Sequence, residues 1–493
     1  MTPLVTDDLP LDILPIIIDG LTSRQDYYAC TLVNKTFNKI ATPLLYRELD
    51  SRAIAKCSLY HPATTLLKRP ELAKYVRHIT ETGSVHRNLS GQSQSMMDDI
   101  RNALSSCTKL TSFAWIDESL STDDTLLSLI EVIRKHKHPL RELTIRTHSD
   151  LGAEVWTQLN ALTGLRSISL WCMEGPPRVL QGWSEPLGPT LTHLELGRCA
   201  GVPPTILVTV LTHLPLLTSL RLKGAPANSI PTILTCLPNL KVLDTEYLPS
   251  FRTAKVPPPE KMPTLTSLTV RTITVDTLGP EKLWSWIKDI LPSSGLEKFK
   301  LHAFTMNNAR YINETAHGEF GDSGTTVPRM FLLDFAKLHG SCLREFDIGM
   351  VELTMSDVRC LKTYFGKLEV LACAVAVPDV SAIHLMISGA RNLHTLKLSV
   401  YWIPYEMHAI SLGGKLLVPK ASPAHLQLKQ EITFTLQNAI DMMLTHENPK
   451  LRNIGIGRQQ FAGKWILVEG ENQRGIPKFE VFADHTGDTK WIP

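Results

Sequence analysis

Two histidines in one basic segment are the first residues of this chain to consider as metal ligands. His136 and His138 lie two positions apart, directly before Pro139. Side chains at i and i+2 of a helix point to different sides, and no cysteine or carboxylate motif joins these two. A solvated helix end is therefore favoured over a metal site. The nine cysteines contain no CxxC pair, which favours reduced thiols. We expect neither a metal nor a cofactor.

A serine tetrapeptide is the second candidate for chemistry. Gly321, Asp322, Ser323 and Gly324 match the nucleophile loop of trypsin-like proteases, but Thr325 and Thr326 follow where those enzymes continue with Gly-Pro. His317 also lies too close in the sequence to come from a separate domain. A phosphorylation-dependent degron is an alternative interpretation. The sequence has no P-loop, dinucleotide-binding or HExxH motif. We expect a protein that is not an enzyme.

The strongest pattern in the sequence is an apolar residue at the first, fourth and sixth places of a short segment, as in Leu191, Leu194 and Leu196. It returns about every 25 residues, and a period of roughly 20–29 residues is typical of leucine-rich repeats. Side chains of a strand alternate between two faces. One repeat cannot bury its apolar face alone, so neighbours must stack. We predict an α/β solenoid: a leucine-rich-repeat arc with a parallel concave sheet and convex helices.

Three parts are expected along the chain. Residues 1–50 form a helical domain, 51–460 the repeat solenoid, and 461–493 a C-terminal strand hairpin that caps the array. Longer spacings leave room for insertions near 305–327 and 401–425, as functional loops or as disordered filler. Apolar periodicity predicts helices in the following ranges: 94–106, 123–136, 153–162, 203–213, 229–237, 280–291, 328–339, 354–365, 379–389 and 426–446. Residues 50–75 are predicted as a junction.

The third, fifth and seventh places of each predicted strand face the concave side, where basic and acidic side chains alternate. Cross-strand charges there are solvated pairs worth about 0–1 kcal/mol, or they match blocks of charge on a protein partner anchored by a tryptophan. The candidates for binding such a partner are Arg146, Trp171, Arg221, Lys223, Asp244, Glu246, Arg271, Lys298 and Lys300.

The N-terminal segment 9–46 predicts two or three short helices, with Pro43 ending the last one. Its residues Leu9-Pro10, Asp12, Ile17, Leu21, Asp26, Leu32-Val33 and Phe37 resemble an F-box. Asn34 and Phe37 stand where that family often has Cys and Trp. F-boxes are three-helix modules that dock on the adaptor Skp1 and so join a cullin ubiquitin ligase. The resemblance implies that Leu9, Pro10, Leu14, Ile17 and Leu21 lie in or near the adaptor-binding face and that Val33 and Phe37 complete the module.

The function implied by this resemblance is the substrate-recognition subunit of an SCF-type ubiquitin ligase, with a Skp1-like adaptor, a cullin complex and an unknown protein substrate as partners. The alternative is a leucine-rich-repeat scaffold that is not linked to ubiquitin transfer and uses its helices as a cap. A third class, a small-molecule receptor, would need a deep apolar pocket beneath the insertions.

Composition excludes several other classes. Apolar residues make up 43% and charged residues 20% of the chain, as in an ordinary folded protein. With 51 basic and 48 acidic residues, the net charge of +3 gives no reason to expect nucleic acid or an anionic membrane as a partner. The N-terminus has no basic region followed by an apolar run. We expect a cytoplasmic or nuclear protein.

Overall fold

The computed structural model of this chain describes ten ranges of residues: 12–51, 61–90, 94–119, 125–248, 257–272, 280–303, 327–402, 432–445, 450–469 and 475–483. The chain forms two compact units, residues 1–225 and 226–493. Leu9 and Pro10, the insertion at 305–327 except Val327, and nearly all of the one at 401–425 lie outside the described residues. Among the helices of the described ranges, none combines the length and apolar character needed to cross a bilayer.

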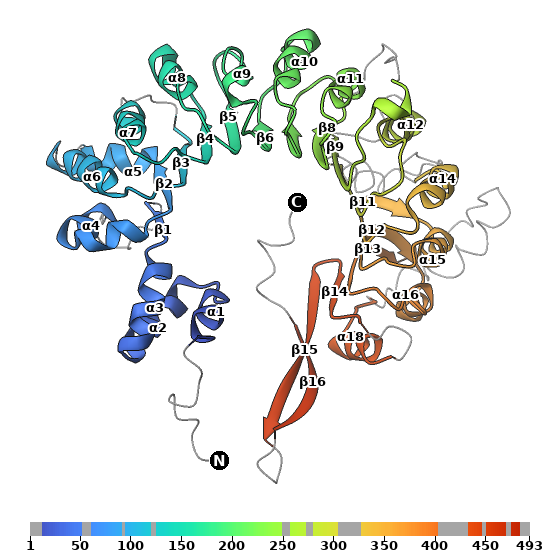
Figure 1. The fold of residues 1–493 in the computed structure, drawn as a ribbon. Coiled ribbons are helices and arrows are strands. Elements are labelled where there is room, and N and C mark those ends of the chain that lie inside the picture. The colour runs from blue at the N-terminus through green and yellow to red at the C-terminus, as the bar shows by residue number, and fades with distance from the viewer. Residues whose placement is uncertain are drawn as a thin grey trace, which may run out of the picture. The chain divides into compact units, whose positions relative to one another are not determined.

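The first unit begins with three helices and continues as a repeating strand–helix array (Figure 1). The helices are α1 (Leu14–Asp19), α2 (Arg24–Val33) and α3 (Lys35–Leu45). The strands are β1 (Glu48–Asp50), β2 (His78–Thr82), β3 (Ser112–Asp117), β4 (Glu142–Thr147), β5 (Ser167–Cys172), β6 (His193–Leu196) and β7 (Ser219–Leu222). Between them lie α4 (Ala63–Lys68), the 3-10 helix η2 (Pro70–Tyr75), α5 (Gly83–Ser90), α6 (Gln94–Ser106), α7 (Thr125–Arg134), α8 (Gly152–Asn160), α9 (Ser184–Leu187) and α10 (Pro204–Thr212).

The second unit repeats this alternation and ends in a hairpin. Its strands are β8 (Val242–Glu246), β9 (Ser267–Thr272), β10 (Lys298–Ala303), β11 (Glu345–Leu353), β12 (Val370–Val377), β13 (Thr395–Trp402), β14 (Asn453–Ile456), β15 (Gln459–Glu469) and β16 (Gly475–Ala483). Its helices are η3 (Ala227–Ser229), α11 (Ile230–Thr235), η4 (Pro259–Lys261), α12 (Pro280–Ile290), α14 (Arg329–His339), α15 (Met355–Tyr364), α16 (Val380–Ile387) and α18 (Leu436–Met443).

Strands pair with their neighbours in chain order. β1–β7 are parallel throughout, and so are β8–β14. The register aligns the same repeat position from strand to strand, as for Ile168, Leu194 and Leu220. These side chains are buried. In each unit, strands lie along one side and helices along the other (Figure 1), which confirms the predicted solenoid-like α/β architecture.

The end of the second unit reverses the strand direction. β15 runs antiparallel to β14, and β16 antiparallel to β15, as the alternating residues of this segment predict. The predicted boundary at residue 461 falls inside β15, because this strand begins at Gln459 beside β14.

Two helix boundaries predicted from the sequence were wrong. Pro43 lies inside α3, which continues to Leu45, because a proline in the last turn removes only one backbone hydrogen bond. The junction at 50–75 contains α4 and η2. α18 begins only at Leu436, after the N-cap Thr435.

Strand β12 has alanines at outward-facing positions. The side chain of Met350 in β11 reaches across this strand, and its sulfur accepts a hydrogen bond from the Ser399 hydroxyl of β13 at 3.0 Å.

Aromatic packing in the second unit offers a test of the core. Phe365 is 1% exposed, stacks on Phe346 and lies at an angle to Phe335, whereas the adjacent Tyr364 is 52% exposed. We expect Phe365→Ala to cost about 3–5 kcal/mol of unfolding free energy, because it leaves a cavity, and Tyr364→Ala less than about 1 kcal/mol. Urea unfolding of the two variants measures the difference, and equal losses would contradict this description of the core.

Candidate interaction surfaces and a buried histidine–glutamate cluster

The three N-terminal helices enclose a hydrophobic core of their own. Leu14, Ile18 and Ala41 are buried at its centre, and partly buried side chains surround them: Leu21, Tyr27, Cys30, Phe37, Ile40 and Leu44. Side-chain caps start two of the helices, since Ser23 accepts a hydrogen bond from the Gln25 N–H and Asn34 one from the Phe37 N–H. Such caps satisfy the free backbone donors at a helix start. The helices therefore form a module with a closed interior.

The same module leaves large apolar side chains in solvent. Ile16 is 73% and Leu32 68% exposed, and more than half of the side-chain surface of Ile17, Tyr28 and Val33 is also exposed. These five residues, two on α1 and three on α2, are called the exposed apolar residues of the helical module below. Large exposed apolar side chains that gather on a small module are typical of interaction sites.

The predicted adaptor-binding residues fall into two groups. Ile17 and Val33 belong to the exposed apolar residues, whereas Leu14 is buried and Leu21 and Phe37 pack against it. Leu14 and Leu21 thus lie in the core of the module, and their place in or near an adaptor-binding face stays a prediction. A short helix that is apolar nearly all round gives no sequence signal for which side turns inward.

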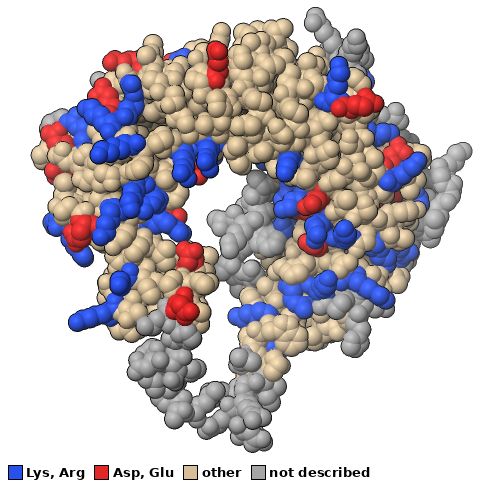
Figure 2. Space-filling view, in the orientation of Figure 1, with Lys and Arg blue, Asp and Glu red and all other residues tan. Residues whose placement is uncertain are grey.

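Four of the predicted partner-binding residues meet around one indole ring on the first unit. Arg146 of β4, Arg221 of β7 and Lys223 after β7 place their charged groups 5.7, 5.1 and 5.5 Å from the ring of Trp171 in β5. Cations at such distances are attracted by the negative face of the ring. Figure 2 shows Lys and Arg side chains over this part of the first unit.

One carboxylate lies among these cations. Glu195 of β6 accepts a hydrogen bond from Arg221 at 2.7 Å and one from the Ser169 hydroxyl at 2.7 Å, and it lies 3.8 Å from the Arg146 guanidinium. Arg146, Ser169, Trp171, Glu195, Arg221 and Lys223 together are called the Trp171 cluster below. Three of its side chains are cationic and one is a carboxylate.

A glycine allows the indole ring of Trp171 to lie close against the backbone after the next strand. Gly197 follows β6, and a Cβ atom at this position would overlap the ring of Trp171. The close approach of the ring to this backbone therefore requires glycine. The sequence alone gives no sign of it, because the two residues belong to different repeats.

Three of the predicted partner-binding residues of the second unit, Asp244, Arg271 and Lys300, are paired with opposite charges. Arg271 forms two hydrogen bonds with Asp244, at 2.9 and 3.0 Å, and Lys300 lies 2.7 Å from Glu345. Burial lowers the pKa of Lys397, and the nearby Asp347 acts against this shift. Arg271, Lys300 and Lys397 thus balance Asp244, Glu345 and Asp347. Lys298 is exposed and Glu246 partly exposed on the same strand face.

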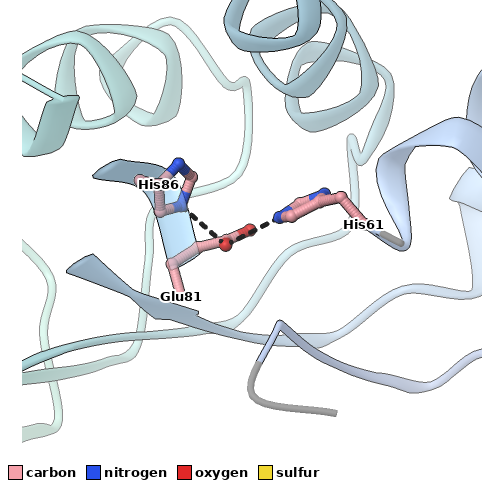
Figure 3. Close-up of side chains that lie close together, drawn as sticks. All are labelled: His61, Glu81 and His86. Atoms are coloured by element: carbon pink, nitrogen blue, oxygen red, sulfur yellow. Dashed lines mark hydrogen bonds and ion pairs between the residues drawn. The ribbon is translucent and has the colours of Figure 1, made fainter. Parts of the chain in front are cut away.

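A buried polar cluster that the sequence analysis missed lies in the first unit (Figure 3). Glu81 of β2 accepts hydrogen bonds through one oxygen from the Nε2 atoms of His61, at 3.0 Å, and His86 of α5, at 2.9 Å. All three residues are buried. His86 also lies 5.4 Å from the ring of Trp115. Strand β2, helix α5 and the segment before α4 contribute these residues at irregular spacing, so no motif could reveal them.

This cluster has the residue types of a metal site, but its hydrogen bonds do not fit one. The three ligand atoms lie within 4.8 Å of one another. The Nδ1 atom of His61, however, accepts the Ala63 N–H at 3.1 Å, so the proton of this imidazole lies on Nε2, the atom that would bind the metal. Metal-binding histidines usually donate their second N–H to an acceptor, and no acceptor is found for Nδ1 of His86 within the described residues.

The electrostatics of the cluster indicate an ionised carboxylate that accepts hydrogen bonds from two imidazole rings. Burial alone would raise the pKa of Glu81, but the hydrogen bonds from His61 and His86 outweigh it and lower this pKa from 4.5 to about 2. Burial and the nearby Glu81 charge raise the pKa of the Cys107 thiol to about 12, so this neighbour stays protonated. The cluster therefore connects His61 with β2 and α5 as a structural network.

Comparison with known proteins gives a distant structural likeness. The solved structures similar to this chain include the "Crystal structure of Rad7 and Elc1 complex in yeast", with a TM-score of 0.42 and 14% identity over 79% of this chain and 88% of that one. No protein-family model matches the chain. No curated protein matches it either. The class that the fold itself defines is a solenoid-like α/β protein.

The close contact between Gly197 and Trp171 predicts a cost for an added methyl group. We expect Gly197→Ala to lower the free energy of unfolding by about 1–3 kcal/mol, because the ring and its strand must move apart. Gly366→Ala is the matched control, since a Cβ there meets no heavy atom within 4 Å. Urea unfolding compares the two variants, and an unchanged midpoint for Gly197→Ala would contradict the packing described.

The lowered pKa of Glu81 predicts a loss of stability in acid. A carboxyl whose pKa is lower in the folded than in the unfolded state stabilises the fold above its unfolded pKa, and this stabilisation disappears as the pH falls. For Glu81 we expect about 3 kcal/mol to be lost between pH 4.5 and about 2.

The Glu81→Gln variant should therefore lose less unfolding free energy than the parent chain as the pH falls through that window, as measured by urea unfolding at a series of pH values. Glu142→Gln is the control, because this side chain is exposed on β4, and this variant should lose as much unfolding free energy as the parent chain. If the Glu81→Gln variant loses as much as the parent chain, the carboxylate is not stabilised as described.

Proposed function

We propose that this chain is the substrate-recognition subunit of a ubiquitin ligase and has no catalytic activity of its own. Its N-terminal helical module would dock on a Skp1-like adaptor in a cullin complex, and the strand face of the repeats would hold a protein target. One observation carries the proposal: the module is closed around its own core and still exposes apolar side chains on α1 and α2.

The exposure supports a partner-binding role over a simple cap. A cap on the first repeat would turn its apolar side chains toward that repeat, because covering the apolar end of the array is its purpose. Here Ile16, Ile17 and Leu32 remain largely in solvent. Burying three such side chains against an adaptor would contribute several kcal/mol, at about 25 cal/mol per Å² of apolar surface.

The contribution of such a subunit to ubiquitin transfer is proximity. A protein that binds an adaptor at one end and a target at another raises the local concentration of the target beside the ligase. An interface of ordinary size buries about 1,600 Å² in total, and the outward-facing residues of several neighbouring strands supply one side of it.

Binding to a purified Skp1-like adaptor tests this proposal. We expect Ile17→Asp combined with Leu32→Asp to weaken the complex about 100-fold or more in isothermal titration calorimetry, because charges would enter an apolar interface. Both positions are exposed in the free chain, so the module should keep its fold. Leu21 is a poorer choice, because a charge there would disturb the core of the module.

The control is Thr22→Asp combined with Thr36→Asp, which adds the same charge at two exposed positions of the module. This variant should bind as the parent chain does. Failure of the parent chain to bind the adaptor, or equal affinity of the parent and the Ile17/Leu32 variant, would overturn the adaptor role and leave the alternative, a repeat scaffold with no link to ubiquitin transfer.

A further inference from the structure

The last strand of the sheet, β16, has one edge without a strand partner among the described residues. β14 pairs with β15 and β15 with β16, and the order of strands ends there. β14 pairs only with Gln459–Ala462 of β15, so the rest of the hairpin extends past β14 (Figure 1). The edge of a last strand presents a row of backbone N–H and C=O groups on which another strand can pair.

One backbone hydrogen bond shows which residues of β16 face this edge. The Gly463 N–H of β15 donates to the carbonyl of Arg452, directly before β14, at 2.8 Å. Gly463 and every second residue after it therefore point their backbone groups away from β16. The residues of β16 opposite these are Val481, Phe479 and Pro477. Because opposite residues of an antiparallel pair point their backbone groups either toward or away from each other together, these three face the open edge.

The proline in β16 agrees with this orientation. Pro477 has no N–H, and within sheets proline is confined to positions such as an edge where the missing donor faces solvent. Proline and lysine also serve to prevent unwanted pairing at edges. Here Pro477 removes only one donor at the start of the edge and keeps its carbonyl, whereas Phe479 and Val481 keep both groups. The edge is therefore still able to pair.

The sequence of this edge is complementary to itself. Two copies of β16 that run antiparallel with Phe479 opposite Phe479 place Lys478 of each copy opposite Glu480 of the other. Each Val481 N–H then lies opposite the Pro477 carbonyl of the other copy. Opposite charges at facing positions stabilise a sheet, and like charges destabilise it. Centring the pair on Lys478 or on Glu480 instead would set like charges face to face, so the charges favour one register.

The same register joins the aromatic side chains of two hairpins. The rings of Trp465 and Phe479 lie 5.2 Å apart, edge to face, and Trp465 is 62% exposed. Pairing of two β16 strands places the two Phe479 side chains next to each other on the same face, where aromatic cross-strand pairs are favourable. On the other face, Glu480 would lie between Lys464 opposite it in β15 and Lys478 of the second copy.

We propose that the open edge of β16 is a homodimerisation site, at which two chains pair antiparallel about Phe479 and join their hairpins into a four-stranded sheet. A second copy is the occupant, because the facing strand must offer an acid, an aromatic residue and a base in that order, as β16 itself does when it runs in reverse. A contact this short covers less area than an interface of ordinary size. We therefore expect a dissociation constant of about 10 µM.

Sedimentation velocity of the full chain between about 1 and 100 µM tests this dimer, since the range brackets the expected dissociation constant. A species of twice the chain mass of 55.0 kDa should increase with concentration. Lys478→Glu and Glu480→Lys each set like charges opposite one another in the dimer, and each should weaken self-association at least tenfold. Both positions are exposed, so the hairpin should keep its fold.

An equimolar mixture of the two variants separates strand pairing from a general effect of charge. At these two positions the Lys478→Glu chain carries two acids and the Glu480→Lys chain two bases, so each can pair with the other. The mixture should dimerise within about threefold of the parent affinity. Arg458→Glu is the control, because it makes the same change of charge at an exposed position between β14 and β15, and it should dimerise as the parent chain does.

The measurement contains no adaptor, so its result is independent of the proposed function. A parent chain that stays monomeric over the whole range would overturn the inference. So would unchanged self-association of both variants, or a mixture that stays monomeric. If Glu480→Lys does not fold because Lys464 lies opposite it in β15, the comparison of Lys478→Glu with Arg458→Glu decides, and equal self-association of these two would overturn the inference.

Discussion

The stacking of one apolar strand face on the next is the constraint on which the rest of this structure depends. Ile168, Leu194 and Leu220 occupy the same position in adjacent strands and bury one another. No repeat can satisfy this requirement alone, so the inward positions are fixed as large apolar residues. The outward positions carry no such requirement, and the chain uses them for charge. The polar strand face is therefore a consequence of how the core is built.

Charge on that face is organised by cross-strand neighbours. Parallel strands in register place equivalent outward residues about 4.8 Å apart, which is within reach of long side chains. In the second unit this spacing brings opposite charges together, as for Asp244 and Arg271. In the first unit the same spacing brings cations together around Trp171. The same geometry thus brings opposite charges together in one unit and gathers cations around an indole ring in the other.

The periodicity of the sequence was sufficient to predict the strands, most helices and the terminal hairpin, because each repeat carries its own apolar pattern. It also selected the residues around Trp171, since alternation alone decides which side chains point outward. It could not reveal the contact of Gly197 with Trp171 or the cluster of His61, Glu81 and His86, which depend on neighbours from different elements. Nor could it separate Leu14 from Ile17, because their helix is apolar on nearly every side.

The reversal of direction after β14 limits how such a chain can change in length over evolution. Parallel strands within either unit follow one rule of pairing, so a repeat inserted or lost among them meets a neighbour of the same kind. Beyond β14 the partner strand runs the opposite way, and an added parallel repeat would find no matching edge. Duplications that lengthen this protein are therefore expected in its interior, where the helical module and the hairpin both stay in place.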